Sequence, residues 1–199
     1  MKSEGTDETT VFWQWFEAIA GELAANVEDP ALLREVDDRM RRIDAALSWE
    51  IGPGLSKPWQ FVVSPNLDAE LREKARAVIS AAPALPGWEF RASRQAKAWD
   101  YQMQLGSPER SIRLDASTWT FVLLRYPGGG HEVLLRAANL PPLSDDERWH
   151  AAAIALESVL GEDAMMDRVG EFELLDELEP GFAEKERPIQ ELRQAVLGT

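Results

Sequence analysis

The stretch that decides the fold class is WTFVLLRYPGGGHEVLLR at residues 119–136, followed by SDDERWHAAAIALESVL at residues 144–160. The first stretch holds two runs of strand-forming residues around a Tyr-Pro-Gly-Gly-Gly loop that suits a hairpin. The second opens with a capping box, because Ser144 can accept from the third helical N–H and Glu147 can reach back to the serine N–H. Its apolar run predicts a deeply buried helix. A strand or mixed segment over 165–175 should follow, which gives the order hairpin, helix, strand.

The same order occurs earlier in the chain, where a hairpin-like stretch, a helix and a short strand fill residues 48–94. Gly52-Pro53-Gly54 separates the two strands of the hairpin, and Pro83 ends the helix. Residues 48–94 and 118–175 are therefore a candidate pseudo-repeat, joined by a long connection over 93–117. The two halves share no residue-level identity, so a duplication stays a hypothesis.

Two helices precede these units. Apolar residues at helical spacing predict the first over 10–26, and Asp29-Pro30 opens the second, with an N-cap followed by proline at the first helical position. We therefore predict an α+β fold in which the two hairpin-helix-strand units form one largely antiparallel sheet with helices packed on one face. The length favours a single domain over residues 1–199.

Four motifs follow one another through the first half of the chain: FWQWF at 12–16, WEIGPG at 49–54, VVSPN at 62–66 and APALPGWEF at 82–90. Together they resemble a family of uncharacterised bacterial cytoplasmic proteins. The segment Arg187-Pro188-Ile189 also looks similar to that family. The resemblance implies a bacterial cytoplasmic protein and carries no reaction, ligand or site residue with it.

Composition excludes several classes of function. The chain has no cysteine, which removes disulfides, thiolate metal sites and cysteine nucleophiles. No basic region followed by an apolar region comes after Met1, so we expect no leader peptide, and no apolar run is long enough to span a membrane. We expect a cytoplasmic protein without a membrane partner. Its formal net charge of -14 opposes binding to nucleic acid. Residues 144–186 carry 14 acids against 3 bases, whereas residues 91–136 carry 7 bases against 4 acids.

The motifs of common catalytic sites are missing or better explained otherwise. Glu147 and His150 have the Glu-x-x-His spacing of di-iron sites, but such sites use the motif twice and Glu147 already suits the capping box. Residues 128–130, Gly-Gly-Gly, lead toward a strand rather than a helix, so they predict a turn and not a phosphate loop. We predict no metal and no cofactor, and no catalytic residue can be named.

Six of the eight tryptophans fall into two predicted groups. Apolar neighbours place Trp15, Trp119 and Trp149 in the core, whereas Trp13, Trp59 and Trp99 fall off apolar stripes or in loops and should be partly exposed. The best candidate for a ligand- or partner-binding patch combines aromatic and basic residues, which can stack on a planar ligand or hold an anion. Its members are Arg91, Arg94, Trp99, Tyr101 and Trp59. The alternative is a loop that packs over the sheet.

These features favour a non-enzymatic binding or regulatory protein that acts through protein–protein contacts. The contact surface would be the acidic segment, residues 144–186, or the loop around Trp99 within residues 93–117. A basic protein partner would suit the charge, as for an immunity protein that inhibits a toxin. The alternative is a small-molecule-binding protein or enzyme that uses carboxylates and arginines near residues 91–113. A third reading is a homo-oligomer formed through the first helix, which carries five large apolar residues.

Overall fold

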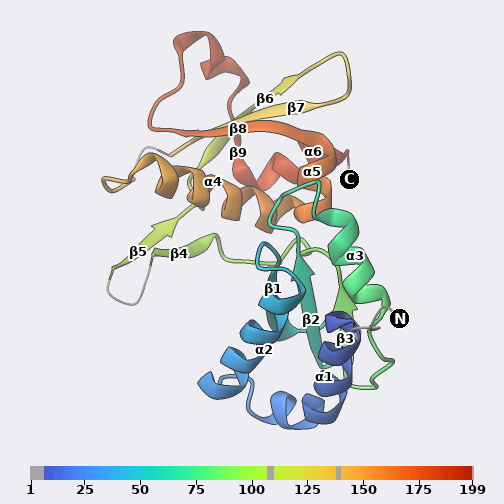
Figure 1. Ribbon diagram of the computed structural model, residues 1–199. Helices are drawn as coiled ribbons and strands as arrows, with labels where there is room; N and C mark the ends of the chain where they lie inside the picture. The colour runs from blue at the N-terminus through green and yellow to red at the C-terminus, as the bar shows by residue number, and fades with distance from the viewer. Residues whose placement is uncertain (1–6, 107–109, 138–139, 199) are drawn as a thin grey trace. The chain divides into compact units, whose positions relative to one another are not determined.

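The computed structural model describes residues 7–106, 110–137 and 140–198. The chain divides into two compact units, Met1–Arg94 and Gln95–Thr199. Both units contain helices and antiparallel strand pairs, which confirms the α+β class (Figure 1). No helix in the described ranges is long and apolar enough to cross a membrane.

The first unit begins with two helices and continues with a three-stranded sheet. Its elements are α1 (Glu8–Ala25), α2 (Pro30–Ile43), β1 (Ser48–Pro53), β2 (Trp59–Ser64), α3 (Arg72–Ser80) and β3 (Trp88–Arg91). The side chains of Asp7 and Asp29 cap the two N-terminal helices by accepting from backbone N–H groups, and Pro30 occupies the first turn of α2. The strand order is β1-β2-β3, with β1 antiparallel and β3 parallel to β2.

Aromatic rings fill the core of the first unit. Phe12 and Phe16 of α1 meet Phe61 of β2, and Phe16 also lies edge-on to Trp88 at 5.1 Å between ring centroids. Trp13 belongs to the same cluster, so the prediction that it is partly exposed is wrong: its exposed fraction is 3%. The reason is that α3 lies beside the main apolar stripe of α1, and the Trp13 indole donates to the carbonyl of Val78 at 2.7 Å.

The second unit holds two sheets. Strands β4 (Gln102–Gly106) and β5 (Ser111–Asp115) form an antiparallel pair. The larger sheet has the order β8-β7-β6-β9, built from β6 (Thr120–Arg125), β7 (His131–Arg136), β8 (Val169–Leu175) and the two-residue β9 (Arg187–Pro188). Its helices are α4 (Asp145–Leu160), α5 (Glu162–Arg168) and α6 (Leu192–Leu197), with 3-10 turns η1 (Pro180–Lys185) and η2 (Ile189–Glu191).

The two predicted hairpin-helix-strand units are present, but their strands do not join one antiparallel sheet. Among the described residues the strands form three sheets. In each sheet that follows a predicted unit, the strand after the helix runs parallel to the strand before it: β3 is parallel to β2, and β8 is parallel to β7. A helix between two neighbouring strands returns the chain to its starting end, so the second strand runs in the same direction as the first. The prediction of a single domain over 1–199 is not tested by the sheet arrangement and stays a prediction.

The segment 93–117 contains more structure than a connection. Its alternation of exposed Gln102 and Gln104 with buried Met103 and Leu105 is that of a half-buried strand. The residues between β4 and β5, 107–109, lie outside the described ranges. The predicted strand from residue 165 begins later, because α5 continues to Arg168 before β8 starts.

Candidate functional site

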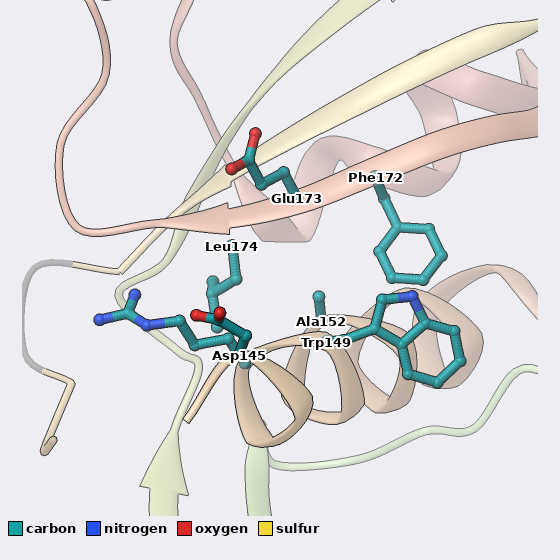
Figure 2. A pocket seen from close by; sticks show the side chains of 7 residues that line it. Asp145, Trp149, Ala152, Phe172, Glu173 and Leu174 are labelled. Atoms are coloured by element: carbon teal, nitrogen blue, oxygen red, sulfur yellow. The ribbon is translucent and has the colours of Figure 1, made fainter. Parts of the chain in front are cut away.

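A groove lies between helix α4 and strand β8 of the second unit (Figure 2). It encloses a cavity of about 210 Å³. The side chains of Phe172 and Leu174 on β8 point toward the helix, whereas the side chain of Glu173 points to the opposite side of the strand. The lining residues are Asp145, Arg148, Trp149, Ala152, Phe172, Glu173 and Leu174. We refer to this set as the α4–β8 groove.

Local sequence positions both walls of the groove. The capping box forms as predicted: the Ser144 hydroxyl accepts from the Glu147 N–H at 3.3 Å, and the Glu147 carboxylate accepts from the Ser144 N–H at 2.8 Å. The pKa of the Glu147 carboxyl lies below its usual value despite partial desolvation. The main cause is the hydrogen bond from the Ser144 N–H, and the Ser144 hydroxyl and the positive charge of Arg110 add smaller contributions. Small residues on α4, including Ala152, let the helix approach β8 closely.

Trp149 stands at the rim of the groove rather than in the core. Its exposed fraction is 48%, and its ring lies 5.5 Å from that of Phe172 with a tilt of 36°. The prediction that Trp149 is buried is wrong, because the alanines of α4 together with Leu156 and Leu160 supply its buried face. The other two predictions hold to different degrees: Trp119 is buried, while Trp15 is half-buried beneath the Arg39 guanidinium.

The surroundings of the groove carry an excess of negative charge. Arg148 is already engaged by Asp176, with its guanidinium nitrogens 2.9 and 3.3 Å from the carboxylate. Asp145, Glu171 and Glu173 are exposed and have no ion-pair partner among the described residues. Asp145 lies at the groove itself, whereas Glu171 and Glu173 lie on the opposite face of β8. A cation beside either face of this strand would therefore meet carboxylates that are not neutralised by the protein itself.

A second cavity, of about 420 Å³, lies on another side of α4 against β4. It is lined by Asp146, Glu147, His150 and Ile154 of the helix and by residues 104–106 of the strand. Glu147 is engaged by Arg110 at 2.5 Å, and the Nδ1 atom of His150 lies 2.7 Å from the carbonyl of Asp146. Within the described residues no group of three or more His, Cys, Asp or Glu side chains could hold a metal ion.

The five residues of the predicted binding patch fall into separate sets. Trp59 stacks on Trp88 at 6.2 Å on the aromatic face of the first sheet. Arg91 lies on the other face, because strand residues alternate and Val62, not Phe61, is its neighbour on β2. There the Arg91 guanidinium is 3.6 Å from the Glu89 carboxylate.

Arg94 follows β3 and contacts the same polar face as Arg91. Its guanidinium lies 2.6 Å from the Ser48 hydroxyl and 3.6 Å from the Glu50 carboxylate. Trp99 and Tyr101 belong to the second unit, where their ring centroids are 5.1 Å apart. The structure thus brings together Arg91 with Arg94 and Trp99 with Tyr101, and it assigns Trp59 to packing. Binding by these residues stays a prediction.

Sequence reasoning missed the α4–β8 groove, although part of its signal was present. The sequence predicts residues 144–186 as one possible contact surface, and that stays a prediction. It also predicts Trp149 in the core and gives no role to Phe172. Apolar residues around Trp149 indicate a buried helix without showing which of its sides meets the edge of a sheet.

The chain was compared with family models, with curated proteins and with solved structures. The family resemblance of its first half stays a prediction, since nothing in these comparisons bears on the four motifs. No family model matches the chain, and no curated protein or solved structure matches it either.

Proposed function

We propose that this is a non-enzymatic binding protein that acts through protein–protein contacts, and that the α4–β8 groove holds a basic segment of its partner. The observation that carries the proposal is the half-exposed Trp149, whose ring is tilted against that of Phe172, beside unneutralised carboxylates. Aromatic side chains are enriched among the residues that dominate binding energy at protein interfaces. An exposed aromatic side chain that contacts a second ring beside an open cavity indicates an interaction site more strongly than scattered exposed apolar residues do.

Charge supports a basic partner. Residues 144–186 carry a net charge of -11, from 14 acids and 3 bases. Such a field accelerates the encounter with a basic protein and weakens as salt is added. It also opposes contact with a nucleic-acid backbone. An inhibitor or immunity-like role toward a basic cytoplasmic protein fits these charges.

The size of the groove supports a side chain as its occupant. Its cavity of about 210 Å³ is smaller than the ~300–1,000 Å³ of ordinary small-molecule sites. An anchoring residue of a partner, surrounded by contacts along the helix and strand, suits a cavity of this size.

The test is a selection of random linear peptides on the full-length protein, followed by titration calorimetry. We expect the selected peptides to be rich in Lys and Arg, to bind more weakly as salt is raised, and to lose about tenfold or more in affinity in Trp149→Ala. The matched control is Tyr126→Ala, which removes another exposed aromatic of the same unit outside the groove. Peptides that bind Trp149→Ala as tightly as the unaltered protein would overturn the proposal.

A second candidate function is small-molecule binding at the cavity between α4 and β4. Its volume of about 420 Å³ falls in the usual range for such sites, and Ile154 and His150 line it together with strand residues 104–106. A fragment screen by ligand-observed NMR tests this candidate. Hits that Ile154→Asp abolishes and Trp149→Ala leaves unchanged support it, whereas hits insensitive to Ile154→Asp contradict it.

A further inference from the structure

The larger sheet of the second unit has two unlike edges. At one edge β9 is two residues long and ends in Pro188, which has no N–H to donate. At the other edge β8 spans seven residues, and among the described residues it pairs with β7 alone. Long edge strands present unpaired backbone groups to which another chain can bond.

The direction of the free backbone groups follows from one hydrogen bond. The carbonyl of Leu175 accepts from the N–H of Ala137, which continues β7, at 2.9 Å. In a strand the N–H and C=O of one residue point to the same side, and successive residues alternate. Glu173 and Leu175 therefore direct their backbone groups toward β7, and Phe172 and Leu174 direct theirs toward the open edge.

The side chains of β8 distinguish the two faces of that edge. Phe172 and Leu174 lie on the α4 side, where the groove and Trp149 are (Figure 2). Glu171 and Glu173 lie on the opposite face and are exposed. A strand added beside β8 would place alternate side chains next to the aromatic pair and the intervening ones next to the two carboxylates.

Charge selects the occupant among the strands that could add here. A second copy of β8 would bring glutamates opposite glutamates, and like charges directly opposite each other destabilise strand pairing. Lys or Arg at the same positions would instead meet the exposed carboxylates of Glu171 and Glu173. The acidic residues thus oppose pairing between copies of this chain and favour a basic strand.

We infer that β8 takes up an extended, basic segment of a partner protein as an additional strand, with an apolar side chain of that segment in the α4–β8 groove. This inference rests on the proposed function and specifies its mode of binding. Main-chain hydrogen bonds to Phe172 and Leu174 supply affinity, and the alternation of basic with apolar residues supplies specificity.

The experiment uses the tightest basic peptide from the selection described above, made with N-methyl groups on alternate backbone amides. Two versions are compared, one methylated at the odd amides and one at the even amides. A peptide that pairs as a strand donates to β8 from one set only, so methylation of that set should lower the affinity about tenfold or more. Methylation of the other set should leave the affinity within about twofold. Hydrogen exchange should show new protection at the amides of Phe172 and Leu174.

Failure of this inference can be told apart from failure of the proposed function. Equal effects of the two methylated versions, or no effect of either, would overturn strand addition while the loss of binding in Trp149→Ala still supports the groove. The absence of any basic peptide sensitive to Trp149→Ala would overturn both.

A charge-reversal variant gives an independent readout. Glu171→Lys combined with Glu173→Lys should lower the affinity for the unmethylated basic peptide about tenfold or more, since the carboxylates opposite its cations are lost. Glu184→Lys combined with Glu179→Lys changes the net charge by the same amount outside β8 and should have a smaller effect. Equal losses in the two pairs would show that only the overall charge matters and would overturn the assignment to β8.

Discussion

Both units contain two antiparallel strands, a helical segment and a third strand parallel to the second, yet they differ in what covers the aromatic residues of these strands. In the first unit α1 packs a cluster of rings against the sheet, and Trp88 and Phe90 of the last strand join it. In the second unit β8 places Phe172 against a half-exposed Trp149. The comparison indicates that the same topology builds a closed core where an extra helix covers it and an open groove at an uncovered strand edge.

The largest expected effect is the loss of a core ring in the first unit. Phe16 is fully buried and contacts the rings of Phe12, Trp13, Phe61 and Trp88, among others. Phe16→Ala should lower the free energy of unfolding by about 3–5 kcal/mol, because it leaves a cavity among aromatic side chains. Urea denaturation monitored by far-ultraviolet circular dichroism measures the change.

The counterpart in the second unit should cost less. Phe172→Ala removes a partly buried ring whose contact with Trp149 is at the surface, so we expect a loss of about 1 kcal/mol in the same experiment. A loss as large as that of Phe16→Ala would contradict the comparison, since the groove would then be part of a closed core.

The helix cap beside the groove gives a further test, with an expected effect of about the same size as that of Phe172→Ala. Ser144→Ala removes the hydroxyl that accepts from the Glu147 N–H, and we expect a loss of about 1 kcal/mol in the free energy of unfolding. Ser158→Ala makes the same change near the other end of α4, away from the cap, and is the control. If both variants unfold at the same urea concentration, the capping box contributes nothing to stability.

The smallest effect concerns pH and the segment between β8 and β9. The hydroxyl of Thr120 and the guanidinium of Arg136 donate to Glu186, and they hold the pKa of its carboxyl below the usual 4.5 against partial burial. The ionised Glu186 carboxylate therefore contributes fully to the free energy of unfolding above a pH of about 4.5, where this residue is also ionised in the unfolded chain. That contribution is lost as the pH falls through the lower pKa of Glu186 in the folded protein.

Thermal unfolding at a series of pH values tests this assignment. The melting temperature of the unaltered protein should fall more steeply below pH of about 4.5 than that of Glu186→Gln, which has no titrating group at this position. Glu184→Gln, a neighbouring exposed carboxylate on η1, should keep the steep fall. Parallel curves for Glu186→Gln and the unaltered protein would show that the carboxylate of Glu186 does not couple folding to pH.

Part of the candidate site could be predicted from the sequence and part could not. The capping box at Ser144 and Glu147 and the acidic excess of residues 144–186 are properties of neighbouring residues, so the sequence alone predicts both. The predicted binding patch does not form one surface. Trp59 and Arg91 lie on opposite faces of one sheet, and Trp99 and Tyr101 belong to the other unit.

The sequence by itself determined the order of helices and strands, because caps, turns and periodicity act over a few residues. Asp29-Pro30, the box at Ser144 and the loop at 126–130 all began or ended elements where local chemistry required it. Only the tertiary structure decided that β3 and β8 run parallel to their neighbours, that Trp13 is buried and that Trp149 is not. Those outcomes depend on which element lies beside a side chain, and such a neighbour is brought there by residues far away along the chain.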